Sequence, residues 1–179
     1  MTRPLTAEQA EFWLQNILLG TLKNEGRTTR SVLEAVPADR ADHRPDPTSR
    51  TAMDLVRHIA IAEKRFVETP IKGFFDVSAT SVPDSLKTPA EIAAWYADSF
   101  AQNFEKLTQL KGEQLSKPID FRGMFQMPAV GFLELGLRHT IHHRGQLCSY
   151  LRCMGGKVPA IYGESFDSAQ AKQAAQGAR

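Results

Sequence analysis

The sequence predicts an all-α protein in which four long helices pack as a four-helix bundle. Three observations lead to this prediction. Apolar residues recur every three or four positions along four long segments, as on one face of a helix. Capping motifs, prolines and glycines mark the ends of these segments. The strict apolar–polar alternation of a half-buried strand is weak throughout, so little β-structure is expected.

The first predicted helix opens at Thr6-Ala7-Glu8-Gln9, which has the form of a capping box. The segment continues toward Val36 and is stopped by Pro37. Residues 37–50 are rich in Pro, Asp and Arg and are expected to form a loop. The apolar side of this helix is predicted to consist of Phe12, Ile17, Leu18 and Leu22.

The second predicted helix starts near Ser49, runs to about Glu68 and ends at Pro70. Residues 70–87 then form a long connection, and loops of this length are often functional. The apolar stripe of this helix has steps of four, three and four residues: Leu55, Ile59, Ala62 and Phe66.

The third predicted helix has the strongest start signal, Thr88-Pro89-Ala90-Glu91, with an N-cap threonine and a proline at the first helical position. Gly112 is its expected end, and residues 111–127 are expected to form a second loop. The aromatic residues of the two loops are candidates for the walls of an apolar acceptor pocket, with ordinary packing as the alternative: Phe74, Phe75, Phe121 and Phe125.

The fourth predicted helix runs from about Pro128 to Met154, where Gly155-Gly156 ends it. After Tyr162 the chain becomes polar and rich in Ala and Gln. We therefore expect a single domain over residues 1–166 and a polar, weakly ordered C-terminal tail over residues 167–179.

Composition excludes several classes of protein. A chain of 179 residues with a net charge of +2 fits one globular domain and carries no basic surface for nucleic acid. The apolar runs are too short to cross a membrane, and no secretory signal precedes the first helix. Cys148 and Cys153 do not form a disulfide framework, so a cytoplasmic location is expected.

Three histidines form the candidate site. His139 and His143 are four residues apart on the fourth helix and therefore lie on one face, as in helical zinc sites. His58 borders the apolar stripe of the second helix and can approach them. Three imidazoles from two helices would leave positions open on a divalent cation, which is typical of a catalytic site.

Neighbouring residues leave alternatives open. His142 could compete as a ligand, although it more naturally borders the site or is exposed. Asp54 could orient His58, or could simply belong to the first turn of its helix. Gln146 could hydrogen-bond a ligand histidine, and Arg144 is expected to be a surface or interhelix ion-pair residue. The histidines could also be packing residues that hold no metal.

The run His139-Thr-Ile-His-His-Arg-Gly-Gln146, with a helix end and Val158-Pro159 after it, resembles the H-x-x-x-H-R-G-Q motif of the DinB-like superfamily, which includes YfiT-like metal-dependent hydrolases. The resemblance spans residues 6–163, and the additional His142 departs from the pattern. It implies an up-down-down-up bundle, frequent homodimers and a divalent metal held by His58, His139 and His143. It also implies low-molecular-weight thiols as co-substrates in some members.

These observations support a metal-dependent enzyme acting on a small molecule, either a hydrolase or a thiol S-transferase. A metal with nitrogen ligands can acidify a bound water or bind a thiolate. The ligand set suits zinc, nickel, iron or copper. The alternative is a non-catalytic bundle that binds the metal or a small molecule as a sensor. A structural bundle without metal is the third possibility.

Overall fold

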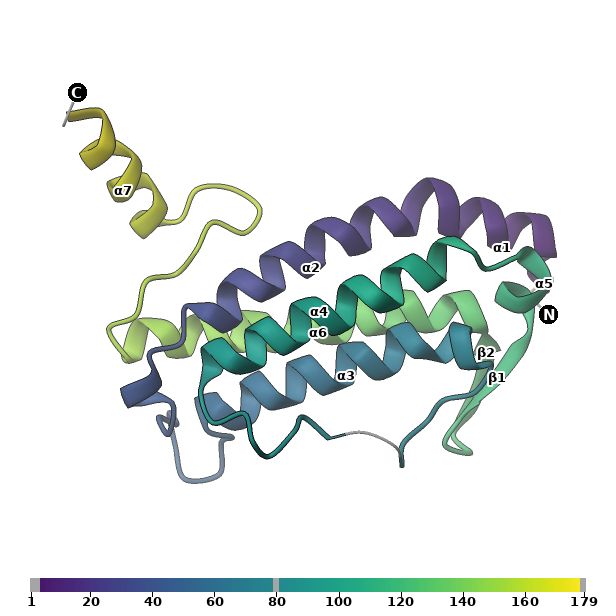
Figure 1. The fold of residues 1–179 in the computed structure, drawn as a ribbon, viewed down its shortest axis with the longest axis horizontal. Helices are drawn as coiled ribbons and strands as arrows, with labels where there is room; N and C mark the ends of the chain where they lie inside the picture. The colour runs from purple at the N-terminus through teal and green to yellow at the C-terminus, as the bar shows by residue number, and fades with distance from the viewer. Residues whose placement is uncertain (1–3, 79–80, 178–179) are drawn as a thin grey trace.

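The computed structural model describes residues 4–78 and 81–177. Its four long helices, α2 (Leu19–Glu34), α3 (Ala52–Lys72), α4 (Pro89–Thr108) and α6 (Ala129–Cys153), lie side by side (Figure 1). The chain runs along α2 and returns along α3. It then runs along α4 in the same direction as α3 and returns along α6. This is an all-α bundle with the up-down-down-up order expected from the family resemblance. Among the described residues, no helix combines the length and apolarity that crossing a membrane requires.

The first helix is interrupted by a π-helical turn. α1 (Ala7–Trp13) passes through the π segment η1 (Leu14–Leu18) directly into α2. The wider turn keeps residues four apart on one face, so the buried positions are Ala10, Leu14, Leu18 and Leu22. Phe12 and Ile17, predicted to face the core, are 61% and 51% exposed, because both lie away from the face that carries these four residues.

Two other predicted boundaries were wrong. Pro70 lies inside α3, and the helix ends at Gly73, whose φ of 77° is the left-handed conformation that glycine adopts easily. Pro70 is buried, so packing holds the last turn in place although the proline donates no backbone hydrogen bond. The helix begins at a capping box between Thr51 and Asp54 rather than at Ser49.

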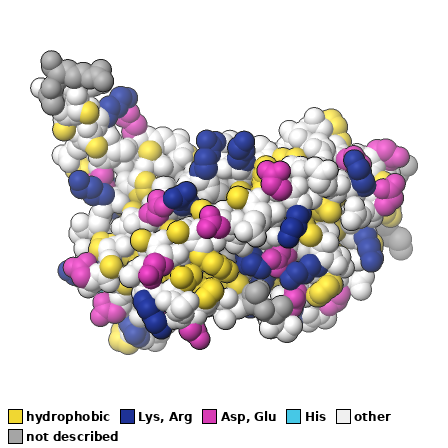
Figure 2. All heavy atoms as spheres, in the orientation of Figure 1, with side chains coloured by type: hydrophobic (Ala, Val, Ile, Leu, Met, Phe, Trp, Pro, Cys, Tyr) yellow, Lys and Arg dark blue, Asp and Glu magenta, His cyan; other side chains and the backbone are white. Residues whose placement is uncertain are grey.

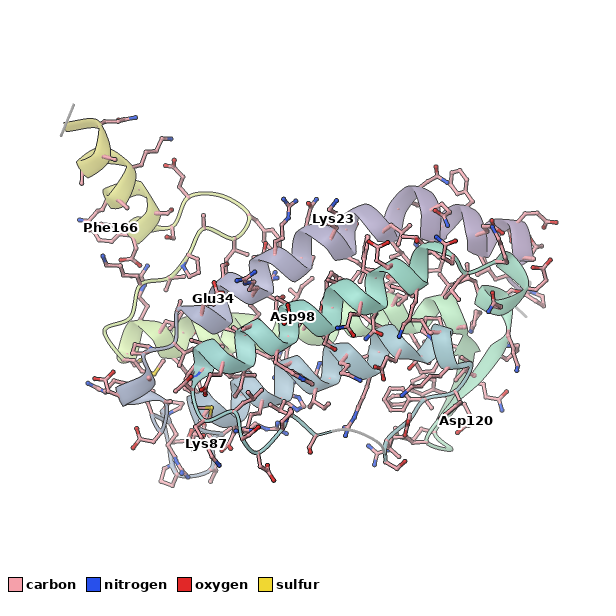
Figure 3. All side chains as sticks on the ribbon, in the orientation of Figure 1. Lys23, Glu34, Lys87, Asp98, Asp120 and Phe166 are labelled. Carbon is pink, nitrogen blue, oxygen red and sulfur yellow. The ribbon has the colours of Figure 1, made fainter. Side chains whose placement is uncertain are left out.

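The second predicted loop contains regular structure. It forms the short helix α5 (Gly112–Ser116) and an antiparallel hairpin of β1 (Pro118–Phe121) and β2 (Phe125–Pro128). In the turn, Gly123 donates its backbone N–H to the side chain of Asp120. Asp120 is labelled in Figure 3. The strands are four residues each, too short for an alternating pattern to stand out in the sequence.

The last helix, α7 (Phe166–Gly177), stands away from the bundle and has no buried residue (Figures 1 and 3). Its first turn is attached through Asp167, which accepts a hydrogen bond from Val158 N at 2.8 Å and pairs with Arg152 at 2.6 Å. The predicted tail is therefore helical where the structure describes it. The domain boundary at residue 166 stays a prediction.

Close contact between α3 and α6 depends on Gly136. A Cβ at this position would lie 2.6 Å from Cβ of Phe66, which is shorter than real contacts allow. The absence of a side chain lets the two helices approach one turn before His139. This contact determines how near α3 comes to the histidines of α6.

A buried ion pair ties α6 to α2. Arg144 is 1% exposed, and its guanidinium pairs with Glu25 at 2.6 Å and donates to Thr29 Oγ1 at 3.2 Å. It also donates to the Tyr162 hydroxyl at 2.8 Å, which fastens the segment after α6 to the bundle. Arg144 is thus an interhelix ion-pair residue rather than a surface one, and its partners satisfy a charge that would otherwise be costly to bury.

Glu63 of α3 is a second buried ionisable group, 2% exposed. Burial raises the pKa of Glu63 to about 7, while the nearby hydroxyls of Tyr96 and Thr140 oppose that rise. Neither carboxyl oxygen has a hydrogen bond of ordinary geometry among the described residues. The neutral acid is therefore favoured at and below neutral pH.

We predict that Glu63 makes the protein less stable as the pH rises. The unfolded chain releases the Glu63 proton near the ordinary glutamate pKa of 4.5, whereas the folded chain holds it until a pKa of about 7. The contribution of Glu63 to stability should fall across this window, by on the order of 3 kcal/mol, and then level off. Urea unfolding from pH 4.5 to pH 8 is compared between the wild type and Glu63→Gln, so that the titrations common to both cancel. The free energy of unfolding of the wild type should fall by this amount relative to that of Glu63→Gln. Glu113→Gln, at an exposed position of α5, should keep the wild-type profile; a constant difference between Glu63→Gln and the wild type would contradict the prediction.

We also predict that Gly136→Ala destabilises the fold although alanine favours helices. The new methyl group would force α3 and α6 apart, at a cost of roughly 1–3 kcal/mol for overpacking. Gly145→Ala is a matched control on the same helix, since nothing lies within 4 Å of its added Cβ, and it should be neutral or stabilising. Urea midpoints of both variants test this, and equal midpoints would show that the close approach is unimportant.

Candidate metal centre

Two helices bring the three predicted histidines together. His58 lies in the second turn of α3, and His139 and His143 lie one turn apart on α6. The Nε2 atom of His58 is 3.1 Å from Nε2 of His139 and 3.1 Å from Nε2 of His143. One nitrogen from each ring lies within 4.8 Å of the others, so the three rings present their nitrogens to a common point.

All three imidazoles are neutral at physiological pH. Burial, together with the charges of Arg50 and the neighbouring histidines, lowers the pKa of His58 to about 4. Burial also lowers the pKa of His139 to about 4, with smaller contributions from His143, His142 and Arg50. The pKa of His143 is lowered by burial too, although Gln146 opposes the shift. Neutral imidazole is the form that binds metal.

Gln146 fixes the tautomer of His143. Its side-chain oxygen Oε1 lies 2.7 Å from Nδ1 of His143, so Nδ1 carries the proton and donates it. The lone pair of His143 is then on Nε2, which faces the other two rings. Hydrogen bonds of this kind commonly orient metal-bound histidines from behind.

The nitrogens of the cluster fit a cation better than they fit one another. A neutral imidazole carries one proton, so His58 Nε2 can donate to His139 or to His143 but not to both. At least one unprotonated ring nitrogen then accepts no hydrogen bond from the other two rings, although the site is half-buried. A divalent cation would use one lone pair from each ring and remove this conflict.

The other predicted neighbours occupy different places. Asp54 belongs to the capping box of α3, where its carboxylate accepts from Thr51 N at 3.3 Å; within the described residues it makes no hydrogen bond to His58. His142 is exposed beside His143 and outside the three-histidine group. His43 is half-buried against Tyr150.

Aromatic side chains form one wall beside the cluster. Phe66 lies 5.6 Å from the His139 ring, measured between ring centroids, and also contacts Phe75 and Phe121. Two of the loop aromatics predicted as pocket walls thus pack within a cluster next to the site. Phe74 and Phe125 are more open, with 56% and 42% of their surface exposed. The aromatic wall is therefore partly packed and partly accessible.

A charged groove that His58 also lines was not predicted from the sequence. Its cavity volume is about 490 Å³, and Arg50, Arg57 and Arg65 are among the residues that line it. Arg57, Ile61 and Arg65 are spaced by four, which indicates one helical face, but only the folded loop shows that this face borders a groove. On the side of the molecule drawn in Figure 2, acidic and basic side chains are interspersed and no histidine is visible.

Comparisons with known sequences identify a matching family and two similar proteins. The model of the DinB family matches residues 9–176. The uncharacterized protein YjoA of Bacillus subtilis strain 168 is 27% identical over 142 residues, which cover 78% of this chain and 90% of YjoA. The uncharacterized protein YrdA of Bacillus subtilis strain 168 is 35% identical over 82 residues, which cover 46% of this chain and 47% of YrdA.

Solved structures agree with the fold. The crystal structure of YjoA, a DinB-like protein from Bacillus subtilis, has a TM-score of 0.67 at 25% identity and covers 84% of this chain and 100% of YjoA. A DinB-like protein from Bacillus cereus ATCC 10987 has a TM-score of 0.69 at 22% identity, covering 89% of this chain and 100% of its own. The second likeness shows the fold alone.

We predict that the cluster binds one divalent cation and keeps it in mildly acidic solution. Because the pKa of His58 and of His139 is about 4, protons should compete with the metal only well below the usual histidine pKa of 6.5. Titration calorimetry with Zn²⁺ should give a stoichiometry near one, with affinity largely retained between pH 7 and pH 5.5. A loss of affinity centred on pH 6.5 would contradict the prediction.

Variants of the same helices provide the controls for this measurement. His58→Ala should abolish tight binding, and Gln146→Ala should weaken it by about 10–100-fold because the His143 tautomer is no longer fixed. His142→Ala should bind as the wild type does, since His142 lies outside the group. Equal affinity in His58→Ala and the wild type would show that the cluster is not the binding site.

Proposed function

The chain belongs to the DinB family, and we propose that it is a metal-dependent enzyme in which His58, His139 and His143 hold one divalent cation. The observation that carries this proposal is the convergence of three neutral imidazole nitrogens, with His58 Nε2 at 3.1 Å from each of the other two. Three protein ligands are the number that leaves a position open for a reactant.

We favour transfer of a low-molecular-weight thiol over hydrolysis. A bound cation would supply Lewis acidity, which lowers the pKa of a water or thiol placed on it. The nearest carboxylate along α3, Asp54, is engaged in its cap and is therefore not free to act as a general base for water. A thiol, whose pKa is about 8.5, needs much less assistance to ionise than water does.

The protein's own residues have distinct tasks in this reaction. Gln146 holds His143 in the tautomer whose Nε2 lone pair faces the reactants. The aromatic wall that starts at Phe66 limits water on one side and offers contact to an apolar electrophile. During transfer, a carbon–sulfur bond forms, the leaving group departs with its electron pair, and the thiol proton passes to solvent.

The proposal includes a small-molecule substrate, a homodimeric assembly and a cytoplasmic location. The homodimer is supported only by the resemblance to DinB-like proteins. Light scattering of the purified chain tests it, because a dimer would double the mass of 19.9 kDa.

We predict metal-dependent consumption of thiols by the wild type. The protein loaded with zinc, nickel or iron should accelerate the reaction of cysteine with 1-chloro-2,4-dinitrobenzene, followed by absorbance. His58→Ala should lose this rate, while His142→Ala should retain it. Faster turnover of 4-nitrophenyl acetate than of the thiol pair would favour a hydrolase. Stoichiometric metal with neither activity would favour a non-catalytic binding protein, and a failure to bind metal would contradict the proposal.

A further inference from the structure

The groove beside His58 carries an excess of positive charge. Among its lining residues are the cations Arg50, Arg57 and Arg65 and the carboxylates Asp54 and Asp84. Three positive and two negative groups leave one net positive charge, before any cation on the histidines is counted. The groove of about 490 Å³ has room for a small organic molecule.

Arg50 is the cation of this groove that is available to a ligand. It is exposed, it directly precedes the N-cap residue of α3, and it makes no hydrogen bond or ion pair with any described residue. Arg57, by contrast, donates to the backbone oxygen of Leu86 and so fastens the long loop against α3. Asp54 is held in the capping box.

Arg50 also lines the same groove as His58. Its positive charge contributes to the lowered pKa of His58, of His139 and of His143 alike. A group held by the Arg50 guanidinium would therefore lie in the groove that His58 also lines.

We propose that Arg50 binds a carboxylate of the substrate, so that the site selects thiols that carry one negative charge. This inference rests on the proposed function, because it assigns the substrate class of the same site. A guanidinium can bind a carboxylate through two parallel hydrogen bonds. A carboxylate is favoured over a phosphate, because Asp54 and Asp84 line the same groove and repel a second negative charge.

The first test compares two thiols that differ only in the carboxylate. N-acetylcysteine and N-acetylcysteamine are titrated into the Co²⁺-loaded protein, and the sulfur-to-cobalt absorption band is followed. The wild type should bind N-acetylcysteine about tenfold more tightly. Arg50→Met should reduce this preference to about twofold or less without changing the affinity for N-acetylcysteamine. Arg44→Met, at an exposed loop position outside the groove, should keep the preference.

The second test does not depend on a metal, so it separates this inference from the proposed function. N-acetylglycine, a carboxylate without a thiol, is titrated into the metal-free protein while the Arg50 Nε signal is followed by nuclear magnetic resonance. A saturable shift, with inorganic phosphate binding more weakly, supports the inference. An unmoved Arg50 signal, tighter binding of phosphate, or an unchanged thiol preference in Arg50→Met would overturn it. If the protein binds no cobalt, the proposed function fails. The Arg50 signal of the metal-free protein still shows whether Arg50 binds a carboxylate.

Discussion

The close approach of α3 and α6 is the constraint on which the candidate site depends. Gly136 leaves no room for a Cβ because Phe66 of the facing helix occupies that space at 2.6 Å. One turn further along α6, the same short separation lets His58 reach both His139 and His143 at 3.1 Å. The helix contact and the histidine geometry therefore depend on the same distance between α3 and α6. A larger distance would separate the rings beyond the reach of one cation.

Adjacent residues of α6 serve different sides of that helix. His143 faces the histidine cluster, whereas Arg144 faces the interior and pairs with Glu25 of α2 at 2.6 Å. A buried ion pair of this kind resists rotation of the helix, because any rotation would leave a charge without its partner. The orientation of His143 thus depends on the ion pair behind it as well as on Gln146 beside it.

Most of the bundle could be predicted because its signals are local. The cap at Thr88 and the glycines after Met154 act within one turn, and the i, i+4 spacing of His139 and His143 fixes their common face. The π segment, the hairpin and the groove around Arg50 could not be predicted, since each depends on how distant segments pack. Asp54 shows the same limit: its phase allowed a contact with His58, and a competing bond to Thr51 decided the outcome.

The π segment at Leu14–Leu18 has a consequence for how this chain should be compared with relatives. A π-turn takes up one residue more than an α-turn and leaves the helix on either side continuous. Evolution can therefore add or remove one residue here without disturbing the positions that contain the histidines. An alignment that forbids a gap within the helix would shift the buried Ala10 by one position, opposite a residue outside the core in relatives that lack the extra residue.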